Sequence, residues 1–344
     1  MEVTGLTRRI VVRDQSEGSS ARRMALRAAE KARFDSGLQG RVSLIAAELS
    51  SNLLKHAGQG GSMLINSVVP ESGVGAVELV AIDRGPGMAN VAAAFEDGYS
   101  STGSLGVGMG AIRRHASHFE IHSVPDRGTA VLARVAADGH LAESQFEVGV
   151  VAIPKDGEDV SGDGWAVSEV PSGIQLLVVD GLGHGLLAHD AATLALETFR
   201  SKAGSEPADV LRAIHPAMRS SRGATASVFT VDTRAQRVTY CGIGNIGAAV
   251  VTVDRANRLM SLNGTVGREP VQFKQFEAEW GPRAVLVAHS DGLATHWRLD
   301  QPGLLAKDPT LIAAVLFRDY ARELDDVTVV VTRQRPPSAA IDGL

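Results

Sequence analysis

The pattern of apolar and polar residues divides the first part of the chain into short elements with frequent breaks at glycine. It predicts helices at 20–34, 38–56 and 105–117, the last opened by a glycine-rich loop. It predicts strands at 6–12, 62–69 and 76–83, and a hairpin of strands at 119–124 and 129–135. Helices mixed with strands in this order indicate an α/β (α+β) domain.

The second part of the chain is richer in strands. The pattern predicts strands at 146–153, 164–170, 173–180, 224–231, 237–241, 248–253, 284–289 and 327–333, and helices at 186–203, 207–220 and 309–324. Small and polar residues at 136–144 separate the two parts. We therefore expect a first domain at 1–138, a linker at 139–144, a second domain at 145–335 and a disordered tail at 336–344.

Composition narrows the function classes. The 344 residues carry a formal net charge of −5, which lacks the basic footprint of a nucleic-acid binder. The single cysteine, Cys241, excludes an internal disulfide framework. No apolar run is long enough to span a bilayer, and the start lacks the apolar region of a signal peptide. We expect a cytoplasmic protein that neither binds nucleic acid nor inserts into a membrane.

The helix predicted at 38–56 carries three polar residues on one face. Glu48, Asn52 and Lys55 are spaced at i, i+4 and i+7. An amide oxygen can bind Mg²⁺, an ammonium group can pair with phosphate, and a carboxylate can take a proton. A solvated polar helix face would show the same spacing, so this cluster is not specific by itself.

Two glycine-rich segments follow that helix. Asp83, Gly85 and Gly87 come at the end of a predicted strand, where the carboxylate can accept a hydrogen bond from an adenine amino group. The second segment opens the helix at 105–117, and backbone N–H groups at such a helix start can bind an anion. Its glycines are Gly103, Gly106 and Gly108.

In this order, the three segments resemble the N box and the two glycine boxes of the GHKL ATPase family. Gly128-Thr129 is similar to that family's late Gly-Thr pair, and the branch most resembled is that of RsbT-like anti-sigma-factor and switch kinases. The resemblance implies a Bergerat-type α/β sandwich that binds ATP and Mg²⁺. It places Glu48 and Asn52 in the N box, with Glu48 as the general base, and puts the Thr129 hydroxyl in the network on the adenine side. From the chemistry of the residues themselves, we expect Asn52 to bind Mg²⁺, Lys55 to pair with phosphate and Asp83 to accept from adenine. The resemblance also implies phosphorylation of Ser or Thr on a STAS-domain antagonist protein.

A histidine kinase is the nearest rival interpretation. It requires a dimerising helical hairpin with a phosphoaccepting histidine upstream of the N box. No histidine precedes Glu48 in this sequence, which argues against that chemistry.

Aspartates stand at predicted strand ends in the second part of the chain, at Asp163, Asp180, Asp291 and Asp325. Carboxylates that share one cleft need a compensating cation, because like charges a few ångströms apart repel strongly. Oxygen ligands without a Cys or His cluster favour Mg²⁺ or Mn²⁺ over Zn²⁺. Two such ions can activate a water molecule and hold a phosphoryl group. Asp-Gly is also a common turn, so each aspartate alone carries little information.

Together, the segments VVDGLGHG, RGATASVFTVD, GIGN, HSDGL and DDVT resemble the SpoIIE branch of the PPM-type Ser/Thr phosphatases, and RsbX-like members most of all. The resemblance implies a β-sandwich flanked by helices and two bound Mn²⁺ or Mg²⁺ ions. Asp180 would bridge both ions, Gly181 would contribute a backbone carbonyl, and Asp291 and Asp325 would bind the second ion.

Other residues of these motifs carry less definite roles. Asp163 would be a metal ligand or would support one. His184 would be the acid for the leaving alkoxide, unless it is only a helix-start residue held by the backbone. Asp326 follows the ligand position and is not expected to bind metal directly. Ser161 replaces the more usual glycine before Gly-Asp.

The whole sequence predicts a bacterial partner-switching regulator that phosphorylates, and through its second domain dephosphorylates, STAS-domain antagonists or stressosome-type proteins. Homo-oligomers are possible. Two alternatives stay open. The first domain could only sense ATP and dock the partner, which leaves the phosphatase as the single enzyme. Alternatively, both folds could serve only for binding, although the intact aspartate set argues against this.

Overall fold

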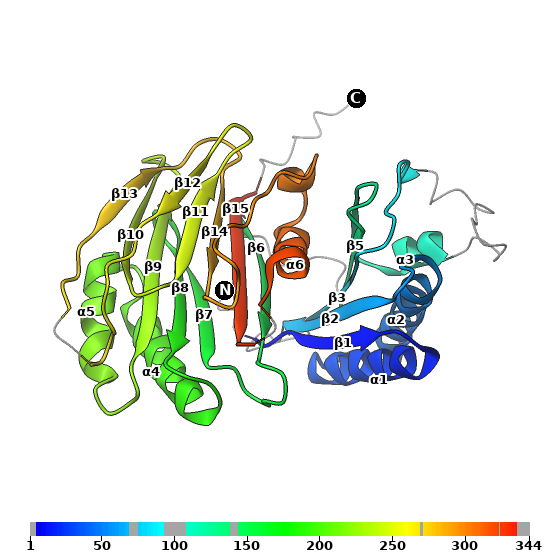
Figure 1. The fold of residues 1–344 in the computed structure, drawn as a ribbon, viewed down its shortest axis with the longest axis horizontal. Helices are drawn as coiled ribbons and strands as arrows, with labels where there is room; N and C mark the ends of the chain where they lie inside the picture. Colours follow the sequence, from blue (N-terminus) through cyan, green and yellow to red (C-terminus); the bar gives the residue numbers. More distant parts are fainter. Residues whose placement is uncertain are drawn as a thin grey trace.

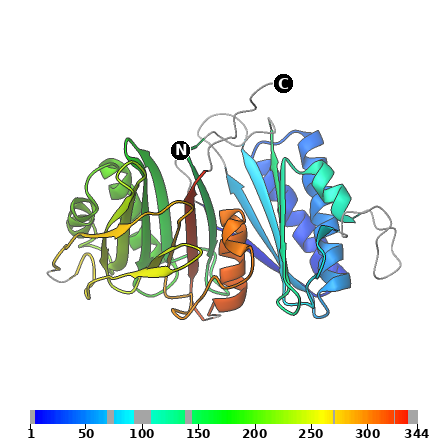
Figure 2. The same ribbon diagram turned by 90° about the horizontal axis from the view of Figure 1, so that it is seen from above.

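A computed structural model of the protein describes residues 5–68, 75–92, 108–137, 144–268, 271–322 and 324–335. These residues form three five-stranded antiparallel sheets and several helices, stacked as successive layers (Figure 1, Figure 2). One sheet belongs to the N-terminal half. The other two form a sandwich in the C-terminal half. The fold is therefore the mixed α/β arrangement that the sequence predicts.

The N-terminal half has helices on one face of its sheet. Its elements are β1 (Arg8–Val12), α1 (Gln15–Lys31), α2 (Ser36–His56), β2 (Gly61–Val68), β3 (Ala76–Asp83), α3 (Gly108–His115), β4 (His118–Ser123) and β5 (Thr129–Ala136). The strand order is β1-β2-β3-β5-β4. The predicted hairpin is confirmed as β4 and β5, which pair antiparallel.

Helix α1 begins five residues before the predicted start at Ser20. Asp14 is its N-cap, and the carboxylate accepts hydrogen bonds from the N–H groups of Ser16 and Glu17 at 2.8 and 2.9 Å. The Glu17 carboxylate in turn accepts from the Arg13 N–H at 2.6 Å. Asp14 and Glu17 have the spacing of a capping box, although Glu17 binds the N–H of the residue before the N-cap. That spacing was a readable signal for the true start.

The C-terminal half is a β-sandwich with helices on both outer faces. Its elements are β6 (Phe146–Ile153), β7 (Asp163–Val170), β8 (Gly173–Gly181), α4 (Leu186–Lys202), α5 (Pro207–Ala217), β9 (Ala224–Asp232), β10 (Arg237–Ile243), β11 (Gly247–Val251), β12 (Ala256–Leu259), β13 (Phe276–Glu279), β14 (Val285–His289), a short 3-10 helix η2 (Leu304–Ala306), α6 (Pro309–Tyr320) and β15 (Val327–Gln334). The sheet orders are β13-β10-β9-β8-β7 and β12-β11-β14-β15-β6.

Three predictions for this half were wrong in detail. Strands β12 and β13 were not predicted, because both are four-residue edge strands with mostly polar, exposed positions. Helix α5 ends at Ala217 rather than Ser220. Helix α6 ends at Tyr320 rather than Leu324, because Ala321 is extended and pairs with Leu293.

Both faces of the N-terminal sheet are buried, which its central strand shows. In β3, Val77 and Leu79 pack with the helices α1 and α2, whereas Val80 and Ile82 point to the opposite face. That second face packs on α6 and through it on the sandwich, in one hydrophobic cluster. Because successive strand residues face opposite sides, only a sheet covered on both sides needs such a continuous apolar run.

Helix α6 therefore forms the layer between the two halves, as both views show (Figure 1, Figure 2). A buried ionic group crosses this boundary. Arg134 of β5 pairs with Glu78 of β3 and donates to both carboxylate oxygens of Asp308, the N-cap of α6, at 2.8 and 2.9 Å. Burial alone would raise the pKa of Asp308, but the neighbouring His118 and the Arg134 guanidinium lower it well below its usual range.

Some predictions fall on parts of the chain outside the described residues. These are most of the linker at 139–144, the tail at 336–344 and the first residues of the helix at 105–117. None of the helices in the described ranges combines the length and the apolar composition that crossing a bilayer requires.

Candidate functional site

Helix α2 places Glu48 and Asn52 beside the start of α3. The helix is fixed by a stripe of buried apolar residues that includes Ile45 and Leu49. A Cβ atom on Gly108 would lie 3.0 Å from Glu48 Oε2 and 3.5 Å from Asn52 Oδ1. The structure therefore brings the predicted N box against the last glycine of the second glycine box, with backbone close to both side chains.

Asp83 organises a second cluster at the end of β3. Its Oδ1 accepts hydrogen bonds from the N–H groups of Gly85 at 2.7 Å and Thr129 at 3.2 Å. The Thr129 and Ser123 hydroxyls lie 2.8 Å apart. Burial raises the pKa of Asp83, and the two N–H groups oppose that effect. Three positions predicted to bind nucleotide are thus joined by direct hydrogen bonds.

Glycine is required at two further positions of this cluster. Gly87 and Gly128 have positive φ values of 66° and 78°. A Cβ on Gly87 would overlap the Val124 carbonyl, and one on Gly128 would overlap the Asp83 carbonyl. The backbone at Gly128 therefore passes very close to Asp83, and the backbone at Gly87 passes very close to Val124. A side chain at either glycine would force the two contacting segments apart.

The remaining predicted residues of the N-terminal site are less informative. Lys55 is exposed on α2, one turn beyond Asn52. Gly103 and Gly106 lie outside the described residues, so the phosphate-binding role predicted for them stays a prediction.

Sequence reasoning missed a residue of the C-terminal half that reaches this site. Arg318 of α6 donates a hydrogen bond from Nη1 to the backbone oxygen of Asp83 at 3.2 Å. Arg84 returns a hydrogen bond to the backbone oxygen of Arg318. No sequence signal could have identified this pair, because the partners are more than two hundred positions apart.

The second site is a small cleft of about 170 Å³ at one end of the sandwich. Its lining comes from the ends of β8 and β14 and from the loops around them, and comprises Lys155, Asp180, Leu182, Gly183, His184, Thr225, Asn245, Asp291 and Asp325. Three of the four predicted aspartates thus share one cleft. The fourth, Asp163, is buried and pairs directly across the strands with Asp180.

The carboxylates of the cleft repel one another. Burial, followed by the charges of Asp291 and Asp325, raises the pKa of Asp180 to about 7. Burial and then Asp325 raise the pKa of Asp291. Burial and then Asp180 raise the pKa of Asp163 well above its usual range. A bound cation would relieve this repulsion, because it favours the charged form of every carboxylate around it.

The residues fit Mg²⁺ or Mn²⁺. The cleft offers the carboxylate oxygens of Asp180, Asp291 and Asp325, which suit hard cations. Gly181, whose carbonyl we expect to be a further ligand, is not among the residues that line the cleft. One oxygen of Asp163, Oδ2, is buried without a hydrogen-bond partner. Within the described parts of the chain, no three metal-ligating side chains already converge on one point. The aspartates therefore surround the cleft rather than close around a fixed position in it.

His184 lies at the cleft and is oriented by a carboxylate from another loop. Its Nδ1 is 2.8 Å from Glu158 Oε1, and half of its side chain is exposed. Because a carboxylate only accepts hydrogen bonds, Nδ1 carries the proton and Nε2 is the free position. Glu158 was not predicted, and nothing in its local sequence marks it.

Asp326 holds a loop in place, as its two oxygens show. Oδ1 accepts from the Lys155 N–H and Oδ2 from the Gly162 N–H, both at 2.9 Å. The carboxylate thus ties down both ends of the loop between β6 and β7, which carries Glu158. Ser161 has a local role, since its hydroxyl accepts from the Asp163 N–H at 3.1 Å. That Asp326 does not bind metal directly stays a prediction.

Two polar residues of the cleft complete the contacts of Asp291. Asn245 donates from Nδ2 to Asp291 Oδ2 at 2.8 Å, and Thr225 donates to Asn245 Oδ1 at 2.7 Å. The segment GIGN contains Asn245, so a motif did point to it. Lys155, the one cation in the cleft lining, follows β6 without any such signal.

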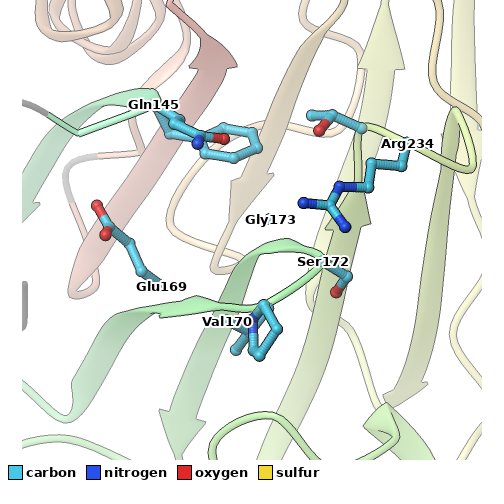
Figure 3. A pocket seen from close by; sticks show the side chains of 9 residues that line it. Gln145, Glu169, Val170, Ser172, Gly173 and Arg234 are labelled. Atoms are coloured by element: carbon cyan, nitrogen blue, oxygen red, sulfur yellow. The ribbon is translucent and has the colours of Figure 1, made fainter.

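A separate cavity of about 240 Å³ lies at the opposite ends of β7 and β8 from the aspartates. Figure 3 shows the side chains that line it. Its lining has one carboxylate, Glu169, and one guanidinium group, Arg234. It contains none of the predicted site residues. The distance along both strands separates it from the aspartate cleft.

Two family models match the chain. A model described as histidine kinase-like ATPase domain matches residues 12–135, and one described as stage II sporulation protein E (SpoIIE) matches residues 171–335. The two matches cover different halves of the chain. The second includes Asp180, Asp291 and Asp325 but begins after Lys155, Glu158 and Asp163.

Relatives of known activity match the same halves. Serine/threonine-protein kinase RsbT of Bacillus subtilis (strain 168) is 30% identical over 114 residues, which are 33% of this chain and 84% of RsbT. Phosphoserine phosphatase RsbX of the same organism is 24% identical over 145 residues, 42% of this chain and 73% of RsbX.

A solved structure described as "The bacterial stressosome: a modular system that has been adapted to control secondary messenger signaling" has a TM-score of 0.51 and 27% identity. The match covers 55% of this chain and 100% of that one. The chain therefore belongs to the histidine kinase-like ATPase family in its N-terminal half, and its C-terminal half matches the SpoIIE family model.

Proposed function

We propose that this chain is a bifunctional partner-switching regulator whose two halves catalyse opposed reactions on one partner. The C-terminal half hydrolyses a phosphoserine or phosphothreonine of a STAS-domain or stressosome-type protein. The N-terminal half transfers the γ-phosphoryl group of ATP to the same hydroxyl. The observation that carries the proposal is the shared cleft of Asp180, Asp291 and Asp325, with His184 at its edge.

The hydrolysis proceeds at that cleft. Two Mg²⁺ or Mn²⁺ ions, when bound, would supply a nucleophilic water and neutralise the phosphoryl oxygens. Asp180, Asp291, Asp325 and the Gly181 carbonyl would hold them. His184, in its imidazolium form with a proton on both ring nitrogens, would give the Nε2 proton to the leaving alkoxide and become neutral, and Glu158 would hold the Nδ1–H throughout. The phosphorus–oxygen bond to the serine or threonine breaks, and inorganic phosphate is released.

The transfer reaction relies on positioning more than on covalent chemistry. Asp83 would accept from the adenine amino group, with Thr129 fixed beside it. Asn52 would hold the Mg²⁺ that accompanies the phosphates, and Glu48 would take the proton of the acceptor hydroxyl. The contact of both side chains with Gly108 keeps the start of α3 next to them, where its N–H groups favour an anion.

The experiment uses the full chain, Mg-ATP and a STAS-domain protein encoded beside its gene. Phosphoryl groups on the partner are counted by intact mass for wild type, Glu48→Ala and Asp291→Ala. Asp291→Ala should let phosphate accumulate, because hydrolysis is lost, and Glu48→Ala should abolish addition. Glu30→Ala and Asp254→Ala, which change exposed carboxylates elsewhere, are the matched controls and should behave as wild type.

If no version adds phosphate while wild type removes it from a pre-phosphorylated partner, the N-terminal half is not a kinase. If wild type does neither, the whole proposal is wrong. If the Glu30→Ala control also failed to add phosphate to the partner, the result for Glu48→Ala would not show a catalytic role of Glu48.

A second candidate function for the N-terminal half is that of a nucleotide sensor. The hydrogen bond from Arg318 to the Asp83 backbone favours it, because α6 belongs to the phosphatase half. Four residues later, the Arg322 N–H donates to the Gly292 oxygen at 2.7 Å, next to Asp291. Nucleotide binding near Asp83 would thus change the position of Asp291 in the metal cleft through the C-terminal end of α6.

The sensor function has its own test. Hydrolysis of p-nitrophenyl phosphate is measured in Glu48→Ala with and without saturating ATP, at fixed free Mn²⁺. A sensor predicts a nucleotide-dependent rate that Arg318→Gln removes. A rate that ATP leaves unchanged would exclude it.

A further inference from the structure

Exposed apolar side chains gather around the aspartate cleft. Six large apolar side chains in the described parts of the chain are exposed: Leu182 (39%), Leu186 (69%), Leu187 (55%), Val253 (85%), Met260 (64%) and Leu324 (83%). The first three lie in the segment that leaves Asp180, and Leu324 directly precedes Asp325. We call these four leucines the leucine rim.

Three of the rim leucines, Leu182, Leu186 and Leu187, are held on an anchored segment. The Leu182 N–H donates to the Gly223 oxygen at 3.0 Å, and the His189 N–H donates to the Gly185 oxygen at 3.0 Å. A Cβ on Gly181 would overlap the Ala188 carbonyl, so the strand end and the helix start are in close contact. The exposure of the leucines is therefore a property of the ordered fold.

The rim is not part of the core of its helix. In α4 the buried positions are Ala188, Ala191, Ala192, Ala195 and Phe199, which pack against the sandwich. Leu186 and Leu187 come before this stripe and stay in solvent. Exposing two leucines at the first helical positions has no benefit for folding, because burial of apolar area is what stabilises the folded chain.

The small size of the cleft also indicates that a substrate makes contacts outside it. Pockets that bind small ligands usually have volumes of about 300–1,000 Å³. The aspartate cleft holds about 170 Å³, and Leu182 is the one large apolar side chain in its lining. Such a space fits a phosphoryl group and little more, so a substrate must make most of its contacts outside the cleft, where the rim lies.

We propose that the leucine rim is the docking surface for the phosphorylated partner protein. Its occupant is a folded protein whose phosphorylated serine or threonine is flanked by an apolar patch. The phosphoryl group enters the carboxylate cleft while the patch covers the leucines. This inference rests on the proposed phosphatase function and goes beyond it, because it assigns substrate selection to apolar side chains, three of which lie outside the lining of the cleft.

The test separates docking from chemistry. The variant Leu186→Ser/Leu187→Ser changes the rim outside the cleft lining. Two substrates are compared, p-nitrophenyl phosphate and the phosphorylated STAS-domain protein. The control is Val253→Ser, an apolar residue that is even more exposed than the two leucines and that follows the opposite end of β11 from Asn245.

The double variant should hydrolyse p-nitrophenyl phosphate at the wild-type rate, whereas its kcat/KM for the phosphoprotein should fall about tenfold or more, as expected when central apolar contacts of an interface are lost. Val253→Ser should match wild type on both substrates. Equal losses on both substrates would mean that the leucines support the fold of the cleft. No loss on either would mean that the partner docks elsewhere.

Binding provides a second readout that does not depend on turnover. Affinity for the phosphoprotein is measured with Asp291→Ala, and with Asp291→Ala that also carries the two serine substitutions. If the leucine rim is the docking surface, the triple variant should bind the phosphoprotein about tenfold more weakly than Asp291→Ala does. Equal affinities would overturn the docking surface, whereas a wild-type chain that hydrolyses neither substrate would overturn the proposed function.

Discussion

At the scale of the residue, two neighbouring aspartates have different environments. Asp325 lines the cleft, whereas Asp326 is 3% exposed and both of its oxygens accept backbone hydrogen bonds from the loop between β6 and β7. A carboxylate whose oxygens are already used by N–H groups has less capacity to bind a cation. The loop that it fixes carries Glu158, which orients His184.

This difference predicts the metal content of two variants. Asp325→Ala should lose about one Mn²⁺ per chain, measured by elemental analysis after gel filtration, because it removes a metal ligand. Asp326→Ala should retain its metal and become less stable by roughly 1–3 kcal/mol, the usual cost of leaving buried N–H groups unpaired. Hydrogen exchange should rise at residues 155–162. Equal metal loss in both variants would make Asp326 a ligand.

The raised pKa of Asp180 predicts how pH acts on the metal-free chain. Its folded pKa is about 7, above its ordinary value of 3.8, so between these pH values the folded state binds more protons than the unfolded state. Stability should therefore fall as pH rises through this window. Mn²⁺ replaces the proton, so the increase in Tm that Mn²⁺ produces should grow from pH 5 to pH 7.5.

Thermal unfolding with EDTA and with Mn²⁺ across this range checks the prediction. Asp180→Asn, which has no charge to lose at this position, is the control and should show a smaller pH dependence. A Tm increase that is the same at pH 5 and pH 7.5 in the wild-type chain would contradict the assigned cause.

At the scale of the element, α6 and β6 lie so close together that there is no room for a side chain at Gly149, the point where they meet. A Cβ on Gly149 of β6 would overlap the backbone of Pro309 and Thr310. The start of α6 is thereby pressed onto the strand, and the same helix packs against the N-terminal sheet on its other side. One glycine thus sets the distance between two layers.

Gly149→Ala should destabilise the chain by about 1–3 kcal/mol or more, because the added methyl group forces the layers apart. Gly40→Ala is the matched control. Its Cβ would meet nothing within 4 Å in the exposed part of α2, so it should stabilise the chain by roughly 0.5–1 kcal/mol through helix propensity. Urea unfolding measures both effects, and equal changes would refute the steric account.

At the scale of the whole molecule, the two halves share one hydrophobic cluster and one buried ionic group. Val80 and Leu132 of the N-terminal sheet pack in the same cluster as Val151 and Leu316 of the C-terminal half. The N-terminal segment also joins the halves, since the Thr7 N–H donates to the Ala152 oxygen at 2.7 Å. We expect the chain to unfold in one cooperative transition rather than two.

Asp308→Asn tests this boundary. Removing one partner of the buried Arg134 pair should cost about 3–5 kcal/mol at pH 7. The pKa of Asp308 is held below its usual range, so its contribution is present above about pH 4 and is lost as pH falls further. The difference in the free energy of unfolding between Asp308→Asn and wild type should therefore become smaller at acidic pH.

Asp209→Asn, at an exposed pair with Arg212, is the control and should change stability little. Denaturation followed separately in each half, for example by hydrogen exchange, reveals whether they unfold together. Independent unfolding of the N-terminal sheet in Asp308→Asn with wild-type stability elsewhere would contradict a shared core.

The sequence by itself determined most elements and both predicted clusters, because each depends on local order. Helical spacing placed Glu48 and Asn52 on one face, and glycine after a strand end marked the surroundings of Asp83 and Asp180. The capping residues of α1 could also have been read locally. The edge strands β12 and β13 could not, because their short polar segments form strands only beside a neighbouring strand.

Only the tertiary structure decided which distant residues meet. It brought three pairs within hydrogen-bond distance whose members are far apart in the chain: Glu158 with His184, Asn245 with Asp291, and Arg318 with the backbone of Asp83. It also made α6 a layer common to both halves and left the rim leucines in solvent. The pattern of apolar residues shows that a residue can be buried. The packing of the layers decides which residues it is buried against, and no single segment of the sequence contains the identity of those neighbours.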